Sequence, residues 1–167
     1  MNKHFFVPVI SLLVITFVVS GCNKENKPAK QWQKMHSEIK KNDEKVISAV
    51  QSFNTWIEKI SDSNLKEYAR DIDKRIKEMT TLKSEIQKIH ADNSELKTVK
   101  DNYIKGITLY VKVMELYKTA IKDERPGLLQ SEIDKLTRFK SELEAVNKNF
   151  LRLRSNYISK YDIRTSN

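Results

Sequence analysis

Apolar side chains recur every three or four residues along most of this chain, which is the spacing of helices with one buried face. Four such stretches predict helices at about 30–60, 64–91, 94–123 and 128–161. Short turns between helices of similar length make neighbouring helices antiparallel. The pattern therefore predicts an all-α, up-down-up-down four-helix bundle, and two long helical hairpins that dimerise side by side are the alternative.

The segments between these stretches contain residues that stop helices. Two of them are polar, at 61–64 and 92–94, and supply side chains that can cap the helix that follows. The third contains Pro126, which cannot continue a helix, and Gly127, which accepts a positive φ.

Two residues interrupt the apolar faces of the predicted helices. Asn42 falls on the face of the first helix, where it either fixes the alignment of the helices from a buried position or lies at the margin of the face. Gly106 lies inside the third helix, where glycine costs roughly 1 kcal/mol relative to alanine. Close packing against a neighbouring helix is the favoured explanation of Gly106, and a hinge is the other.

The first 22 residues have a different pattern. A short start with one lysine precedes an apolar run over residues 5–19, which ends in Val19, Ser20, Gly21 and Cys22. A basic start, an apolar middle and small residues at a cleavage point are typical of a secretory signal peptide. The ending is similar to the lipobox of bacterial lipoproteins. That resemblance implies recognition of Val19, Ser20 and Gly21 by a signal peptidase, cleavage before Cys22, and a diacylglycerol on the Cys22 thiol.

An ordinary secretory signal and a transmembrane anchor are the alternatives for this segment, but the apolar run is short for a span of about 20 residues. The lipoprotein interpretation divides the chain into a signal peptide (1–21), a lipidated cysteine with a short tether (22–29), a bundle (30–163) and a frayed tail (164–167). Because Cys22 is the only cysteine, the bundle is expected to fold without a disulfide.

The predicted bundle shows no motif for catalysis or for a cofactor. Neither His36 nor His90 has the glutamate three residues earlier that inward-facing di-iron sites in bundles use, and both are interpreted as solvated. No acidic residue is expected on the buried faces. The tyrosines on these faces are interpreted as core residues, and they are Tyr68, Tyr103, Tyr110 and Tyr117. We therefore expect no enzyme activity, no metal site and no cofactor apart from the covalent lipid.

Basic residues outnumber acidic ones, with 31 Lys and Arg against 22 Asp and Glu in the whole chain. Two groups of them are candidate contacts to an anionic surface, namely Lys24, Lys27, Lys30 and Lys34 beside the predicted lipid, and Lys148, Arg152 and Arg154 in the fourth helix. Such charge either keeps a helix surface solvated or attracts lipid headgroups or wall polymers. Nucleic acid is not an expected partner, because the chain is predicted to be exported.

The mature chain has Lys- and Glu-rich helices after the lipobox, a tyrosine-rich stretch at 103–117 and a closing segment at 147–161. In these features it resembles the cell-wall-binding lipoproteins of low-GC Gram-positive bacteria.

We expect a membrane-anchored envelope lipoprotein whose bundle binds an envelope component, such as a protein partner, without catalysis. A carrier or chaperone for an apolar ligand or partner helix, and an immunity or exclusion lipoprotein, are the alternatives. The expected location is the extracytoplasmic side of a membrane, and Asn23 favours the outer membrane if the bacterium is Gram-negative.

Overall fold

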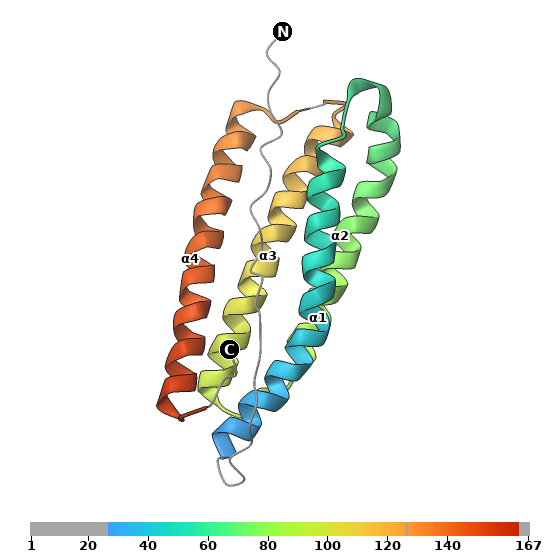
Figure 1. The fold of residues 1–167 in the computed structure, drawn as a ribbon. Helices are drawn as coiled ribbons and strands as arrows, with labels where there is room; N and C mark the ends of the chain where they lie inside the picture. Colours follow the sequence, from blue (N-terminus) through green and yellow to red (C-terminus); the bar gives the residue numbers. More distant parts are fainter. Residues whose placement is uncertain (1–26, 126, 164–167) are drawn as a thin grey trace.

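The computed structural model describes residues 27–125 and 127–163, and Figure 1 shows their four long helices. The elements are α1 (Lys27–Ile57), a short 3-10 helix η1 (Asp62–Asn64), α2 (Leu65–Lys88), α3 (Ser94–Lys122) and α4 (Gln130–Lys160). Consecutive long helices run in opposite directions, so the predicted all-α, up-down-up-down bundle is confirmed (Figure 1). The predicted signal peptide, Cys22 and the predicted frayed tail lie outside the described residues.

Three helices begin or end a few residues from where the sequence predicts. α1 already begins at Lys27, inside the predicted tether, because Pro28 fits a first helical turn whose N–H groups need no helical partner. α4 begins at Gln130 rather than near 128, and Leu129 is extended, with ψ at 160°. The Leu129 N–H donates to the Glu132 carboxylate at 2.8 Å, which fixes the start of α4. The apolar spacing of the fourth predicted helix places Leu129 on its inward face, but Leu129 precedes α4 and is 54% exposed.

The core of the bundle is organised around α3, which packs against both α2 and α4. Its tyrosines, spaced by seven residues, reach α1 (Figure 1 shows the paths of the two helices). The Tyr110 hydroxyl donates to Asn54 Oδ1 at 2.8 Å, and Phe53 of α1 lies edge-on to the rings of Tyr110 and Tyr117 at 5.9 Å. The interpretation of these tyrosines as core residues is confirmed.

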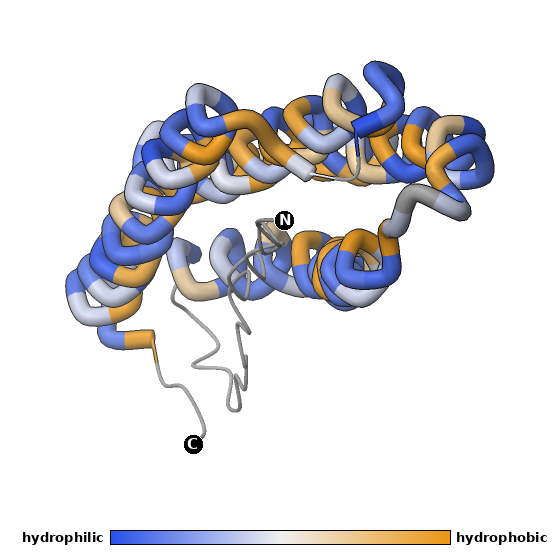
Figure 2. The backbone as a smooth tube through the Cα atoms, turned by 90° about the horizontal axis from the view of Figure 1, so that it is seen from above, coloured by the Kyte–Doolittle hydropathy of each residue, from blue (hydrophilic) through white to orange (hydrophobic). Residues whose placement is uncertain are grey.

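Each helix alternates between hydrophobic and hydrophilic residues, as Figure 2 shows from above. In α1 the apolar spacing predicts a buried face that includes Ala49 and Trp56, with Val50 and Ile57 at its edge, and in the structure this face is rotated slightly toward Val50 and Ile57. Val50 and Ile57 are fully buried, whereas Ala49 and Trp56 are only partly buried. This rotation of the buried face places Asn42 at its margin, where the Asn42 amide donates to the Glu38 carbonyl of the same helix at 3.2 Å. Of the two explanations of Asn42, the marginal position is the one that the structure shows.

The same rotation of α1 buries two polar residues that were expected to lie outside the core. Asp43 is 3% exposed and accepts a hydrogen bond from the Tyr103 hydroxyl of α3, so the expectation of no acidic residue on a buried face is wrong. His36 is 7% exposed and stacks on Trp32, with 5.5 Å between ring centroids, so its interpretation as solvated is wrong as well. His90 is exposed, as expected.

Gly106 lies on the side of α3 that faces α4. A methyl group added there would lie 3.7 Å from Val146 Cγ1 and 3.8 Å from Leu143 Cδ1, which are ordinary van der Waals distances. The helix continues through Gly106 from both sides, so no hinge forms there, but the added methyl group fits without a clash, so packing against α4 does not require glycine either.

Gly106→Ala is therefore expected to stabilise the bundle by about 1 kcal/mol, because it removes the helix penalty of glycine without a clash. Thermal and denaturant unfolding of the two proteins would measure the gain. Ala145→Gly, at an exposed position of α4, is the matched control and should lose a similar amount. A loss of stability in Gly106→Ala would contradict this expectation, because it would show that the added methyl group clashes with α4, as close packing requires.

Candidate functional site

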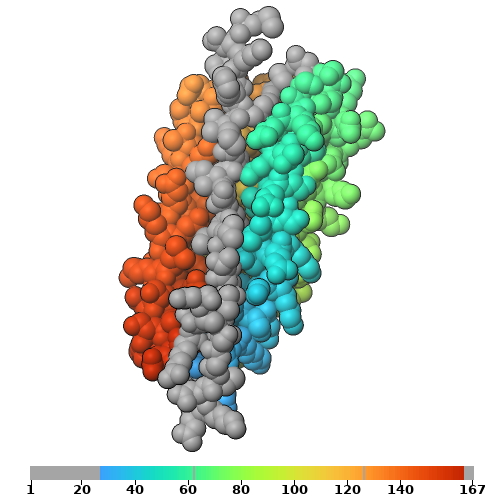
Figure 3. Space-filling model, viewed as in Figure 1, coloured from blue at the N-terminus to red at the C-terminus, as the bar shows by residue number. Residues whose placement is uncertain are grey.

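The start of α1, the turn between α2 and α3, and the end of α4 meet at one end of the bundle (Figure 1). Figure 3 shows the start of α1 and the end of α4, blue and red, at the same lower end. Side chains join these segments. Trp32 stacks on Tyr157 with 5.6 Å between centroids, and the Asn93 amide donates to Gln31 Oε1 at 3.3 Å and to the Tyr157 hydroxyl at 3.2 Å.

The charge of the bundle is concentrated at this end. We define the basic end as the half formed by residues 27–42, 77–108 and 145–163, and the opposite half as residues 43–76 and 109–144. The basic end carries 15 Lys and Arg against 7 Asp and Glu, which is a net charge of +8. The opposite half carries 13 against 14, which is a net charge of −1. Almost all of the excess basic charge therefore lies in one half.

Ion pairs between described residues also differ between the halves. In the opposite half they join Arg75 to Asp71, Lys118 and Lys122 to Asp73, and Arg125 to Asp123 and Glu132. At the basic end, Lys160 pairs with Glu95 at 2.6 Å, and this hydrogen bond lowers the pKa of Glu95. Lys27, Lys30 and Lys34 project from the first turns of α1 and are exposed.

The structure places in the same half of the bundle the two groups of basic residues that the sequence indicated separately. Lys27, Lys30 and Lys34 lie near the start of α1, and Lys148 and Arg152 lie in the last half of α4, all of them exposed. Arg154 is partly buried on the same part of α4, where it faces His36 of α1 closely enough to lower the pKa of that imidazole. Lys24, Cys22 and the predicted recognition residues Val19, Ser20 and Gly21 lie outside the described residues.

Sequence reasoning missed the contribution of α3 and of the end of α2. Lys97 and Lys100 are far from both groups in sequence, but the antiparallel path places the start of α3 at the basic end. Lys100 Nζ donates to the Ile89 carbonyl at 2.6 Å and so binds the last residues of α2 to α3. The signal that could have found them is the predicted up-down order of the helices combined with a count of charge by half.

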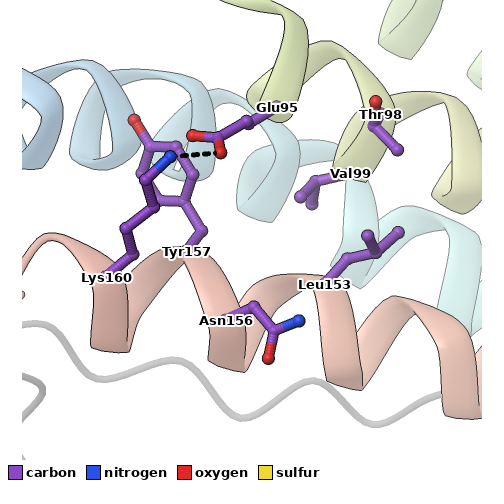
Figure 4. A pocket seen from close by; sticks show the side chains of 7 residues that line it. All are labelled: Glu95, Thr98, Val99, Leu153, Asn156, Tyr157 and Lys160. Carbon is purple, nitrogen blue, oxygen red and sulfur yellow. Dashed lines mark hydrogen bonds and ion pairs between the residues drawn. The ribbon is translucent and has the colours of Figure 1, made fainter.

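A shallow cavity of about 200 Å³ opens at the basic end between α3 and α4 (Figure 4). Val99 and Leu153 form an apolar wall, and the Lys160–Glu95 ion pair crosses one side of the opening. Its full lining is Glu95, Thr98, Val99, Leu153, Asn156, Tyr157 and Lys160. The lining offers apolar contact from Val99 and Leu153 beside one ion pair, which is the chemistry of a small binding hollow.

Three polar side chains are buried where α1 packs against its neighbours, namely His36 and Asp43 of α1 and Tyr103 of α3. Their surroundings shift their pKa values. Burial raises the pKa of Asp43 while the Tyr103 hydrogen bond opposes that rise, and burial with the Asp43 charge raises the pKa of Tyr103 well above its usual range. Burial, with smaller effects of Arg154 and Lys40, lowers the pKa of His36 to about 4, so His36 is neutral at physiological pH. Within the described ranges, no three His, Cys, Asp or Glu residues are placed to hold a metal ion.

The chain matches no family model, no curated protein and no solved structure. The site is therefore interpreted from its own geometry and charge.

Proposed function

We propose that this chain is a membrane-anchored bacterial envelope lipoprotein whose helical bundle is a non-catalytic binding module for another envelope component. The observation that carries the proposal is the order of a basic start, an apolar run and Val19, Ser20, Gly21 and Cys22. The location is the extracytoplasmic side of a membrane, which is the outer membrane if the bacterium is Gram-negative.

Two features of the bundle support this proposal. α1 begins only five residues after Cys22, so the folded part follows the lipid attachment point directly. The end of the bundle from which the chain leads to Cys22 is also the basic end, which is the charge that anionic headgroups or wall polymers attract.

The carrier alternative has less support from the described residues. The cavity between α3 and α4 has about 200 Å³, which is below the roughly 300–1,000 Å³ of typical small-molecule sites. A second hollow of about 500 Å³ lies beside α2 and α3, but charged and polar side chains such as Lys97, Asp101 and Lys105 line most of it, which does not suit an apolar ligand. A binding module that acts through its surface is the better fit.

Cys22→Ala is expected to leave an unprocessed precursor without attached fatty acid, because alanine offers no thiol to receive the diacylglycerol. Metabolic labelling with a fatty acid, followed by mass measurement of the purified protein, would show both effects. Gly21→Ala keeps a small residue at the predicted cleavage point and is the matched control, which should be processed and labelled normally. Normal maturation of Cys22→Ala together with an unlabelled wild type would overturn the proposal of a lipid anchor.

A further inference from the structure

We propose that the basic end is a docking surface for an anionic phospholipid bilayer, on which the bundle stands upright. This inference rests on the proposed function, because the predicted lipid on Cys22 is what keeps the basic end close to a membrane. It adds which surface of the bundle meets the membrane, which lipid chemistry attracts it, and which end is left for other partners.

The length of chain between Cys22 and Lys27 limits where the bundle can lie. Five residues span at most about 18 Å when fully extended, whatever their conformation. The start of α1 therefore stays within that distance of the lipidated residue. The 31 residues of α1 extend about 46 Å from there. The basic end is thus tied close to the membrane, whereas an upright bundle holds the opposite end far above it.

The charge of the basic end is opposite in sign to that of an anionic bilayer, and it lies close enough to the headgroups to interact with them. A Debye length of about 8 Å at physiological salt lets only charges close to the headgroups contribute. Lys27, Lys30 and Lys34 occupy the first turns of α1 and are exposed, and Lys88 and Lys97 are exposed beside the neighbouring turn. A basic residue at such a surface strengthens binding about fivefold, which corresponds to about 1 kcal/mol.

The lysines of α1 are placed against the preference of the helix itself. α2, α3 and α4 each carry a glutamate in the first turn, where the positive end of a helix dipole favours acidic residues. The first turn of α1 has no acidic residue and contains Lys27 and Lys30. The first described turn of α1 thus gives these lysines no favourable interaction with a helix dipole, and an anionic surface would supply a favourable one.

The attraction is electrostatic rather than an insertion of apolar side chains. Trp32, Ile89 and Ile163, which lie next to this end, are buried in the bundle, and Ile158 and Tyr161 are partly buried. Leu151 is 46% exposed, but it lies nine residues before the last residue of α4. Binding to the bilayer should therefore weaken with salt and should need anionic lipid.

The first experiment uses the chain from Asn23 without lipid, which retains all four helices and the core from Ala29 to Ile163. Its helical fold is checked by circular dichroism. We expect it to bind phosphatidylcholine vesicles that contain one quarter phosphatidylglycerol, to lose that binding at 0.5 M salt, and to ignore pure phosphatidylcholine. Binding to both vesicle types, or to neither, would overturn the proposal. Binding only to a soluble polyglycerol phosphate would replace the bilayer with a wall polymer and would also overturn it.

Matched triple substitutions locate the surface. A triple variant with glutamine in place of Lys27, Lys30 and Lys34 should bind the anionic vesicles at least tenfold more weakly. Lys59, Lys66 and Lys74 are exposed in the opposite half, and the same change there removes the same charge. This control should alter binding less than twofold. Equal effects of the two triples would show attraction by net charge alone and would overturn the docking surface.

The orientation can be measured with the two tryptophans of the chain. Trp56→Phe leaves Trp32 in the second turn of α1, and Trp32→Phe leaves Trp56 about 36 Å further along that helix. Lipidated protein on anionic vesicles should transfer energy to a dansyl headgroup efficiently from Trp32 and several times less from Trp56. Similar transfer from both would mean that the bundle lies flat. Failure of fatty-acid labelling would overturn the anchor separately, because the lipid-free vesicle assay does not depend on it.

Discussion

Phe53→Ala is expected to lower the free energy of unfolding by about 3–5 kcal/mol, because it leaves a cavity in the part of the core where α1 meets α3. Phe53 is 0% exposed, and its ring lies 5.6 Å from that of Trp56 and 5.9 Å from those of Tyr110 and Tyr117. Denaturant unfolding followed by circular dichroism would measure the loss.

The matched control for this prediction is Leu151→Ala. Leu151 is 46% exposed on α4, so its truncation should cost less than about 0.5 kcal/mol. A Phe53→Ala protein that unfolds at the same denaturant concentration as the wild type would contradict the packing of α1 against α3.

The second large effect is a loss of stability in mild acid that depends on His36. The pKa of His36 is lowered from 6.5 to about 4 in the folded protein, mainly by burial and then by the charges of Arg154 and Lys40. The unfolded chain therefore binds the proton first as the pH falls below 6.5, and the folded state loses stability until the pH reaches about 4. The full loss is on the order of 3 kcal/mol, of which about 2 kcal/mol falls between pH 6.5 and 5.

Asp43 acts in the opposite direction at lower pH. Its raised pKa means that the folded protein takes up this proton before the unfolded chain does, so the contribution of Asp43 to stability increases as the pH falls toward 3.8. The difference in pH dependence between the wild type and a His36 variant therefore isolates the contribution of His36.

Denaturant unfolding at pH 7 and pH 5 tests this prediction. His36→Gln, which stays neutral, should remove most of the pH dependence in that window. His90→Gln changes an exposed imidazole and should leave it unchanged. The same pH dependence in His36→Gln and in the wild type would contradict the role of His36.

The sequence predicted the number, order and approximate length of the helices because each is long and has one continuous apolar face. It did not predict the rotation of α1, since Val50 and Ile57 form one apolar stripe while Ala49 and Trp56 form another beside it. Both stripes fit a helical spacing, and only packing against Tyr103, Tyr110 and Tyr117 selects the first. Burial of His36 and Asp43 follows from that selection.

The candidate site was predicted in parts. The lysines at the start of α1 and the basic residues of α4 are visible as separate groups in the sequence. Their meeting at one end depends on the antiparallel order of four helices, and Lys97 joins them only through the turn between α2 and α3. Charge patterns along a sequence show clusters on one element, whereas a cluster shared by four elements requires the fold.

The early start of α1 at Lys27 also sets how far this protein can extend from a membrane. With the proposed lipid on Cys22, the five residues before α1 and the length of α1 together allow a height of about 64 Å. Residues 58–64, 123–125 and 127–129 then form the outermost surface. An envelope component that contacts this surface must come within about 64 Å of the membrane. Components that stay farther from the membrane cannot contact the bundle.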